Sequence, residues 1–98
     1  MSEQSHQDRS TLKRLLALVF IYVESPALES VIHTLSQISK VEELYEVTGE
    51  YDIVALISAV DIEEFRQLLQ GRIQKINGVR STVSSIVTHT HKGPLSTS

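Results

Sequence analysis

Apolar and polar positions change their spacing several times along the chain, and each change marks an expected element. Residues 15–24 are apolar up to Val23, and their β-branched and aromatic side chains favour a strand buried on both faces. Ser25 then offers a capping oxygen, and Pro26 suits a first helical position, where its missing N–H costs nothing. Apolar residues follow at spacings of three and four, which predicts an amphipathic helix with this buried stripe: Leu28, Val31, Ile32, Leu35 and Ile38.

The middle of the chain predicts two strands joined by a tight turn. Residues 41–48 mix apolar positions with Glu42, Glu43 and Glu46. That mixture suits an edge strand, because charge there discourages pairing with other chains. Gly49 and Glu50 predict a two-residue hairpin turn of the II′ kind, with glycine at its first central position. Residues 51–59, nearly all apolar, form the third strand.

The last third predicts a second helix and a final strand. Asp61 and Glu64 stand three residues apart in a capping-box pattern, which marks the helix start. Asn77 and Gly78 end the helix, and residues 79–91 form the last strand. The buried stripe of this helix consists of Ile62, Phe65, Leu68, Leu69, Ile73 and Ile76.

The resulting order, β-α-β-β-α-β, predicts an α+β fold of the ferredoxin-like type. We expect a four-stranded antiparallel sheet with two helices on one face. The two strands that are apolar on both faces, residues 15–24 and 51–59, are the ones that this topology places in the centre. Two helices cover only one face, so the second apolar face predicts sheet-to-sheet pairing in a symmetric homodimer.

Length and composition set the domain organisation. The 98 residues fit one domain, 15–92, between polar segments 1–14 and 93–98 that we expect to be flexible tails. The absence of cysteine excludes disulfides and thiolate chemistry and fits a cytoplasmic protein. The apolar run 15–23 falls short of the about 20 residues of a membrane-spanning helix. A secretion signal there is the less favoured alternative, because cleavage would remove a strand that the fold needs.

Charge argues against direct nucleic-acid binding. Nine Lys and Arg stand against twelve Asp and Glu, for a net charge of −3, and the basic residues are dispersed along the chain. Binding driven by phosphate contacts needs a basic stripe or face. We therefore expect no direct contact with DNA or RNA, and none with membranes.

No residue pattern indicates catalysis, a metal site or a cofactor. His89 and His91 stand two apart on the expected last strand and share a face, but two ligands do not make a metal site, and solvated side chains are the favoured interpretation. Serines and threonines are plentiful, yet none sits in a nucleophile elbow, and there is no glycine-rich nucleotide motif. We expect a non-enzyme.

Residues 48–52 carry the most informative chemistry. Asp52 follows the expected hairpin tip and leads into a central strand. It can accept backbone N–H bonds at the strand end, which is the interpretation favoured on chemistry alone, or accept a ligand ammonium group. Gly49 would let backbone N–H groups approach a ligand carboxylate closely.

Two motifs in this element order resemble the effector-binding (RAM) half of Lrp/AsnC regulators. They are Thr48-Gly49-Glu50-Tyr51-Asp52-Ile53 and Asn77-Gly78-Val79-Arg80-Ser81-Thr82-Val83-Ser84, and the likeness covers about residues 15–92. It implies a module that binds a small molecule, of which an amino acid is the expected kind. The contact residues implied are Gly49, Asp52, Thr82 and Ser84, with Tyr51 a weaker candidate. Ser84 departs from the usual threonine, which leaves the effector open.

The same resemblance implies partners and assembly. Family members carry an N-terminal helix-turn-helix, and the fourteen polar residues before the first strand are too few for one. We therefore expect a stand-alone module that modulates transcription or amino-acid metabolism through partners, full-length Lrp/AsnC regulators among them. The resemblance further implies dimers that associate into rings such as octamers.

Two alternatives share the element order. An ACT-type regulatory domain also binds amino acids at subunit interfaces, but it usually has a glycine-rich turn after the first strand, where this chain has Glu24-Ser25-Pro26. A small dimeric α/β-barrel enzyme would need a buried acid-base residue in the sheet cleft, and the strand interiors offer only hydroxyls.

Overall fold

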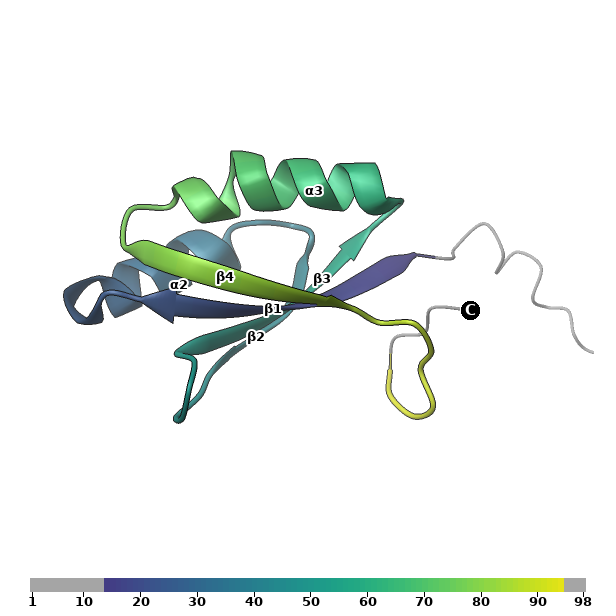
Figure 1. The fold of residues 1–98 in the computed structure, drawn as a ribbon, viewed down its shortest axis with the longest axis horizontal. Helices are drawn as coiled ribbons and strands as arrows, with labels where there is room; N and C mark the ends of the chain where they lie inside the picture. Colours follow the sequence, from purple (N-terminus) through teal and green to yellow (C-terminus); the bar gives the residue numbers. More distant parts are fainter. Residues whose placement is uncertain (1–13, 95–98) are drawn as a thin grey trace, which may run out of the picture.

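A computed structural model describes residues 14–94, and the outer parts of the two expected tails lie outside them, as does His6. Four strands, two α-helices and two short 3₁₀ helices follow one another in the expected order (Figure 1). They are β1 (Leu15–Val23), η1 (Ser25–Ala27), α2 (Leu28–Ser36), β2 (Val41–Glu46), β3 (Ile53–Ala59), α3 (Ile62–Gly71), η2 (Ile73–Lys75) and β4 (Val79–Ile86).

The strands form one antiparallel sheet in the order β2-β3-β1-β4. The prediction of a ferredoxin-like α+β fold with β1 and β3 in the centre is confirmed. The register of β1 on β3 runs from Leu15 opposite Ala59 to Ile21 opposite Ile53. Since residues directly opposite each other share a face, this register decides which side chains lie on each side of the sheet.

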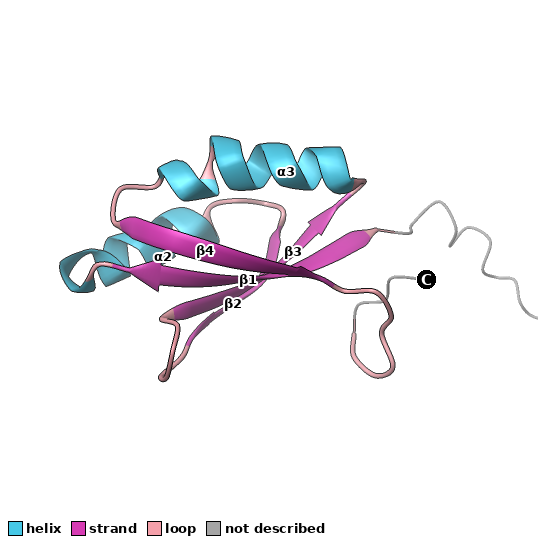
Figure 2. Cartoon of the chain, viewed as in Figure 1, coloured by secondary structure: helices cyan, strands magenta, loops and turns pink. Residues whose placement is uncertain are grey.

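Both helices cover the same face of the sheet (Figure 2). On that face, every second residue of β1 and β3 is fully or almost fully buried: Ala17, Val19, Ile21, Ile53, Ala55 and Ile57. The helices contribute Val31 and Leu35 from α2 and Phe65 and Leu68 from α3. This agrees with the two predicted stripes except at Ile62, which was expected to be buried and is 45% exposed at the start of α3.

The other face of the sheet, which we call the open face, carries apolar side chains that no helix covers. Leu18, Phe20, Val54 and Leu56 are half-buried along its centre. Toward the two edges, Tyr45 is 53% and Val83 is 47% exposed. Their register opposite Val54 and Phe20 places both on this face. The prediction of a second apolar face is therefore confirmed.

The helix starts differ in how well the sequence predicted them. Pro26 lies in the first turn of η1, as expected, but the Ser25 side chain forms no cap, and this part of the prediction is wrong. The Asp61 carboxylate accepts from the Glu64 N–H at 2.9 Å, which confirms the cap of α3. Glu64 in turn accepts from the Val60 N–H at 2.8 Å, one residue before the position that a standard capping box uses.

The predicted two-residue turn at Gly49 and Glu50 is wrong. Strand β2 ends at Glu46 and β3 begins at Ile53, so a six-residue loop, 47–52, joins them. A bond from the Val47 N–H to the Asp52 carbonyl, 2.9 Å long, closes this loop. The ladder stops early because the chain bends at 48–50, where Gly49 has a φ of +124°.

The predicted last strand, residues 79–91, is also too long. Strand β4 ends at Ile86, and the Val87 N–H still bonds to the Leu16 carbonyl at 2.8 Å. Beyond that bond, residues 88–94 leave the sheet and curl beneath its end, as the yellow segment of Figure 1 shows. His89 and His91 therefore do not lie on a strand.

A polar cluster closes the end of the open face where β1 begins. Ser58 is only 1% exposed, and its hydroxyl donates to the Glu42 carboxylate at 2.6 Å. The Arg14 guanidinium donates to the same hydroxyl at 3.0 Å and lies 3.4 Å from Glu42. The buried serine is thus fully paired, which its burial requires.

Within residues 14–94, every helix is too short or too polar to cross a lipid bilayer.

Gly78 is a position where the fold requires glycine. Its φ is +103°, and a Cβ built there would overlap the Ala27 side chain at the start of α2. We expect Gly78→Ala to lower the free energy of unfolding by about 2–4 kcal/mol, from backbone strain and overpacking together. Gly71→Ala is the matched control, because nothing lies within 4 Å of its Cβ position at the end of α3. It should leave stability unchanged or raise it by up to about 1 kcal/mol. Urea unfolding followed by circular dichroism measures both, and equal effects would contradict this account.

Candidate functional site

The loop 47–52 brings the first predicted motif to one end of the sheet. Gly49 lies near the tip of this loop, is exposed, and has open space around its Cβ position. Its positive φ is the reason for a glycine here, because other residues rarely adopt that conformation. The loop leaves backbone N–H groups near its tip accessible to solvent.

Asp52 ties this loop to the end of β1. Its backbone N–H donates to the Ile21 carbonyl at 3.1 Å, and its carboxylate Oδ2 accepts from the Val23 N–H at 2.9 Å. The Val23 N–H lies where the β1–β4 register shifts, between Tyr22 and Val23. One carboxylate oxygen therefore holds the strand end in place, and no donor from residues 14–94 contacts the other oxygen.

Tyr51 joins an aromatic cluster at the same end of the open face. Its ring centroid lies 4.8 Å from that of Tyr22 and 5.2 Å from that of Phe20, with tilted planes in both cases. Such tilted contacts at this spacing are favourable for aromatic rings. The loop and the end of β1 are thus held together by the hydrogen bond of Asp52 and by the tilted contacts of these aromatic rings.

A hollow of about 310 Å³ adjoins this cluster, lined by Tyr22, Arg80 and Ser81. The register explains its composition, because Ser81 lies opposite Tyr22 in the β1–β4 pair and shares its face, while Arg80 lies at the register shift. Burial raises the pKa of the Tyr22 phenol, and the nearby groups of Glu50, Tyr51 and Asp52 raise it further. The phenol therefore remains a neutral hydrogen-bond donor at physiological pH.

The two predicted hydroxyl residues of β4 lie on the other side of the sheet. Thr82 is opposite Ile21, and Ser84 is opposite Val19, so both face the helix side. The Thr82 hydroxyl accepts from the Gln74 side-chain amide at 2.9 Å, whereas Ser84 is exposed. The structure thus brings Gly49, Tyr51 and Asp52 together and separates Thr82 and Ser84 from Tyr51.

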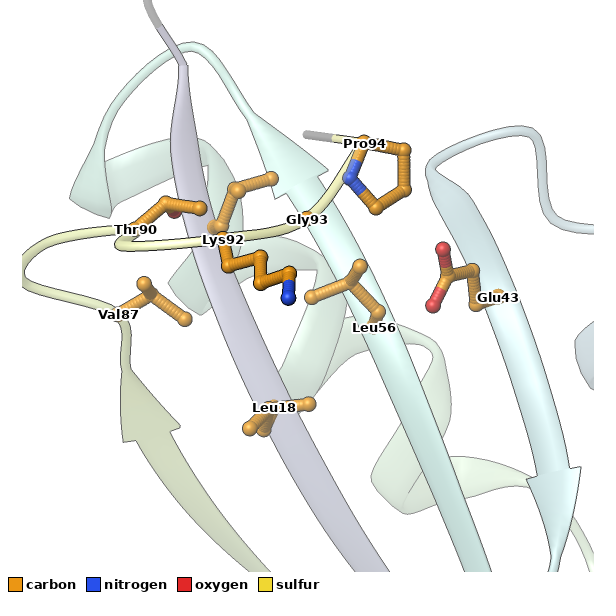
Figure 3. Close-up of a pocket in the computed structure, with 9 residues that line it drawn as sticks. Leu18, Glu43, Leu56, Val87, Thr90, Lys92, Gly93 and Pro94 are labelled. Carbon is orange, nitrogen blue, oxygen red and sulfur yellow. The ribbon is translucent and has the colours of Figure 1, made fainter. Parts of the chain in front are cut away.

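A second hollow, of about 180 Å³, lies at the opposite end of the open face (Figure 3). The segment 87–94 passes over it, and the Lys92 side chain runs across the sheet toward Leu56. Leu16, Leu18 and Leu56 form its floor. This hollow is therefore the space between the segment 87–94 and the part of the open face that the segment covers.

The two exposed histidines of this segment lie next to each other. The rings of His89 and His91 have centroids 4.8 Å apart. Among residues 14–94, no group of three or more His, Cys, Asp or Glu side chains is arranged to hold a metal ion.

The sequence matches the family model of the Lrp/AsnC ligand binding domain over residues 16–95, essentially the whole folded part. The chain belongs to the Lrp/AsnC family. This membership confirms the resemblance inferred from the motifs around Gly49 and Gly78. It favours the Lrp/AsnC interpretation over the ACT-type alternative.

Three similar proteins illustrate the relatives of this Lrp/AsnC domain. An uncharacterized HTH-type transcriptional regulator from Pyrococcus abyssi is 31% identical over 78 residues, 80% of this chain and 49% of that protein. The chain therefore spans about half the length of that relative. Homocitrate synthase from Saccharolobus islandicus is 41% identical over 58 residues, 59% of this chain but only 12% of the enzyme.

The third is a solved structure, the feast or famine regulatory protein from M. tuberculosis complexed with L-methionine. It superposes with a TM-score of 0.73 at 28% identity, covering 95% of this chain and 61% of that protein. The Lrp/AsnC domain here thus has the fold of a domain in a regulator that holds an amino acid.

Sequence reasoning missed Tyr22, Arg80 and Ser81 as residues of this Lrp/AsnC domain that line a hollow. Arg80 and Ser81 lie inside the second motif, but the family resemblance implies the hydroxyls of Thr82 and Ser84 as ligand contacts and not these two residues. Tyr22 lies within an apolar run that predicts a strand, so the sequence does not single it out as a site residue. The register that sets it opposite Ser81 is not visible in the sequence.

The Asp52 contact predicts a stability effect. Removal of the carboxylate in Asp52→Ala leaves the Val23 N–H without its partner, so the free energy of unfolding should fall by about 1–3 kcal/mol. We therefore expect Asp52→Ala to weaken the fold as well as to remove a candidate ligand contact. Asp52→Asn keeps an acceptor oxygen and should cost less.

Glu50→Ala is the control for this prediction, because Glu50 is exposed and its side chain makes no hydrogen bond or ion pair with residues 14–94. It should change the free energy of unfolding by no more than about 0.5 kcal/mol. Chemical denaturation of the four proteins decides the matter. Equal stability of Asp52→Ala and the parent would show that the bond to Val23 contributes nothing.

Proposed function

We propose that this chain is a non-enzymatic effector-binding module that self-associates through its open face and binds an amino acid. The observation that carries the proposal is the apolar strip along the centre of that face, Leu18, Phe20, Val54 and Leu56, flanked by exposed Tyr45 and Val83. A contiguous apolar patch of this kind on a small domain is typical of a protein interface. A symmetric pairing of two such faces buries the same patch on both copies.

Amino-acid binding is supported by family membership and by the likeness to the methionine-bound regulator from M. tuberculosis. A free amino acid presents a carboxylate and an ammonium about 3 Å apart, so its site needs donors beside an anionic acceptor. The loop 47–52 supplies accessible N–H groups near Gly49 and the unpaired carboxylate oxygen of Asp52. These are the chemical types that such a site needs.

The module acts through partners. Its net charge is −3, and it matches the part of the P. abyssi regulator that makes up about half of that protein. The match to a short part of homocitrate synthase supports the view that such modules serve enzymes as well as transcription regulators. Dimers that assemble further, into octamers or similar rings, and co-assembly with full-length Lrp/AsnC regulators complete the proposal.

Self-association is tested with a charge placed at the centre of the open face. Val54 lies opposite both Phe20 and Tyr45 and belongs to the exposed side of the sheet. We expect the parent to be dimeric or larger at micromolar concentration and Val54→Glu to be monomeric, because burial of an unpaired carboxylate in an apolar interface costs several kcal/mol. Size-exclusion chromatography with light scattering measures the mass.

Gln70→Glu, which adds the same charge on the exposed surface of α3, is the matched control and should assemble like the parent. Circular dichroism confirms that both variants fold. A parent protein that is monomeric at this concentration would contradict the proposed assembly.

Effector binding is tested by a thermal-shift screen of the twenty amino acids. A ligand present at about 100 times its Kd stabilises the native state by about 2.7 kcal/mol. For a domain of this size such a gain raises Tm by about 10 °C or more. At least one amino acid should produce a shift of this order. If all twenty leave Tm unchanged at millimolar concentration, the chain is not an amino-acid sensor.

A further inference from the structure

The open face is covered near one end and exposed nearer the other. Leu16 lies opposite Ser58 and therefore belongs to this face, yet it is only 2% exposed. Val83, nearer the other end, is 47% exposed. Because both helices lie on the opposite face, the cover over Leu16 is the segment 87–94, which lines the hollow of about 180 Å³ above it (Figures 2 and 3).

Few contacts hold this segment on the sheet. The bond from the Val87 N–H to the Leu16 carbonyl, 2.8 Å long, is its last hydrogen bond to a strand. Within the described part of the chain, no hydrogen bond or ion pair joins positions 88–94 to the rest of the domain. The hollow beneath the segment shows that it does not pack closely on the leucines. Such a cover opens at a small cost in free energy.

The segment and a second copy of the chain exclude each other at this end of the face. The backbone N–H and C=O groups of positions 88–94 have no partner among residues 14–94, so they depend on water. A partner sheet laid over them would remove that water, and it would also strip water from the ammonium group of Lys92. An apolar partner can therefore bury Leu16 and its neighbours only after the segment has moved away.

We propose that the segment 88–94 is a displaceable cover that competes with a second copy of this chain for the open face. The cover thereby sets the concentration at which the chain self-associates. The inference rests on the proposed self-association and adds a means by which the chain regulates it.

Two residues suit the segment to this role. Gly93 has a φ of +151°, a conformation that favours glycine, at the bend that brings Pro94 into the lining of the hollow. The Lys92 side chain runs across the sheet toward Leu56, so its carbon chain shields apolar surface (Figure 3). The Lys92 ammonium group keeps its contact with water, as is usual for long charged side chains. The cover thus protects the face without becoming part of a dry core.

The size of the effect depends on the fraction f of copies whose face is uncovered. A symmetric pair needs two uncovered faces, so the apparent Kd rises as 1/f² relative to a chain without a cover. A cover that is in place about half to nine-tenths of the time raises Kd about fourfold to a hundredfold. The monomer then persists to a higher concentration than its apolar face alone would allow.

A matched pair of double variants of the full chain tests the competition. Thr90→Gly with Lys92→Gly removes two side chains that line the hollow, whereas His89→Gly with His91→Gly adds the same number of glycines at exposed positions that do not line it. Sedimentation velocity over a dilution series should give the first variant a Kd at least about fourfold below that of the second. Loss of the Lys92 charge would by itself weaken association, because the chain already carries a net charge of −3. Circular dichroism checks the fold of both variants.

The rates supply a second reading. The cover acts on the free monomer, so its removal should speed association and leave dissociation unchanged. Subunit exchange between two fluorescently labelled populations measures dissociation. A variant that changed only the exchange rate would show that Thr90 and Lys92 contact the partner within the assembly, which would overturn the cover.

A spin label reports the position of the segment directly. The chain has no cysteine, so His91→Cys supplies a single labelling position. In the Val54→Glu monomer, the label should broaden the methyl signals of Leu18 and Leu56, which line the hollow. In the assembled parent these signals should be sharp, because the segment has left the face.

The outcomes separate this inference from the proposed function. If the parent self-associates and the two double variants have equal Kd values, the cover is overturned and self-association stands. If a label on one copy broadens the leucine signals of the other in a mixed assembly, the segment is exchanged between copies, and the competition is overturned. If the parent and every variant remain monomeric, the proposed self-association fails, and its regulation fails with it.

Discussion

The antiparallel pairing of β1 with β3 determines where every other part of the domain lies. Both strands are apolar on their two faces, and their register from Leu15 opposite Ala59 to Ile21 opposite Ile53 aligns those faces. The helices bury one face and leave the other with apolar side chains in contact with water. The ends of this pair then differ: one carries the hydrogen-bonded cluster of Ser58, and the other carries the aromatic cluster and the hollow beside Tyr22.

Much of the fold could be predicted from the sequence, because the spacing of apolar residues along the chain reflects which positions are buried. The doubly apolar strands and the two helical stripes were visible in the chain. The predicted helix end at Asn77 and Gly78 is wrong, because α3 ends at Gly71 and the separate 3₁₀ helix η2 follows it. Strand ends were less predictable, since apolar or alternating residues continue past the ends of β2 at Glu46 and of β4 at Ile86. The loop 47–52 ends β2, and the segment that leaves the sheet after Val87 ends β4. Neither feature produces a periodic pattern of apolar residues that could be recognised in the sequence.

The candidate site was predictable only in part, for a related reason. The motif Gly49-Glu50-Tyr51-Asp52 is local, so its residues stay together in the loop. Thr82 and Ser84 are in the second motif, and alternation along β4 turns them to the helix side while Ser81 faces the open side. Which face each residue takes depends on its register with β1, and register between strands sixty residues apart leaves no trace in one sequence. The partner of the Asp52 carboxylate, the Val23 N–H, was hidden in the same way.

The segment 87–94 makes the two ends of the open face different. It lies over Leu16, Leu18 and Leu56, so the end of the face near the start of β1 already has a tethered occupant (Figure 3). A tethered segment competes at an effective concentration far above that of any free partner. A second molecule therefore meets competition at that end and none from this segment at the end near Tyr22. In the proposed assembly, contact would therefore begin most readily beside the loop 47–52, and the length of the apolar strip that a partner buries would depend on how far the segment 87–94 moves away.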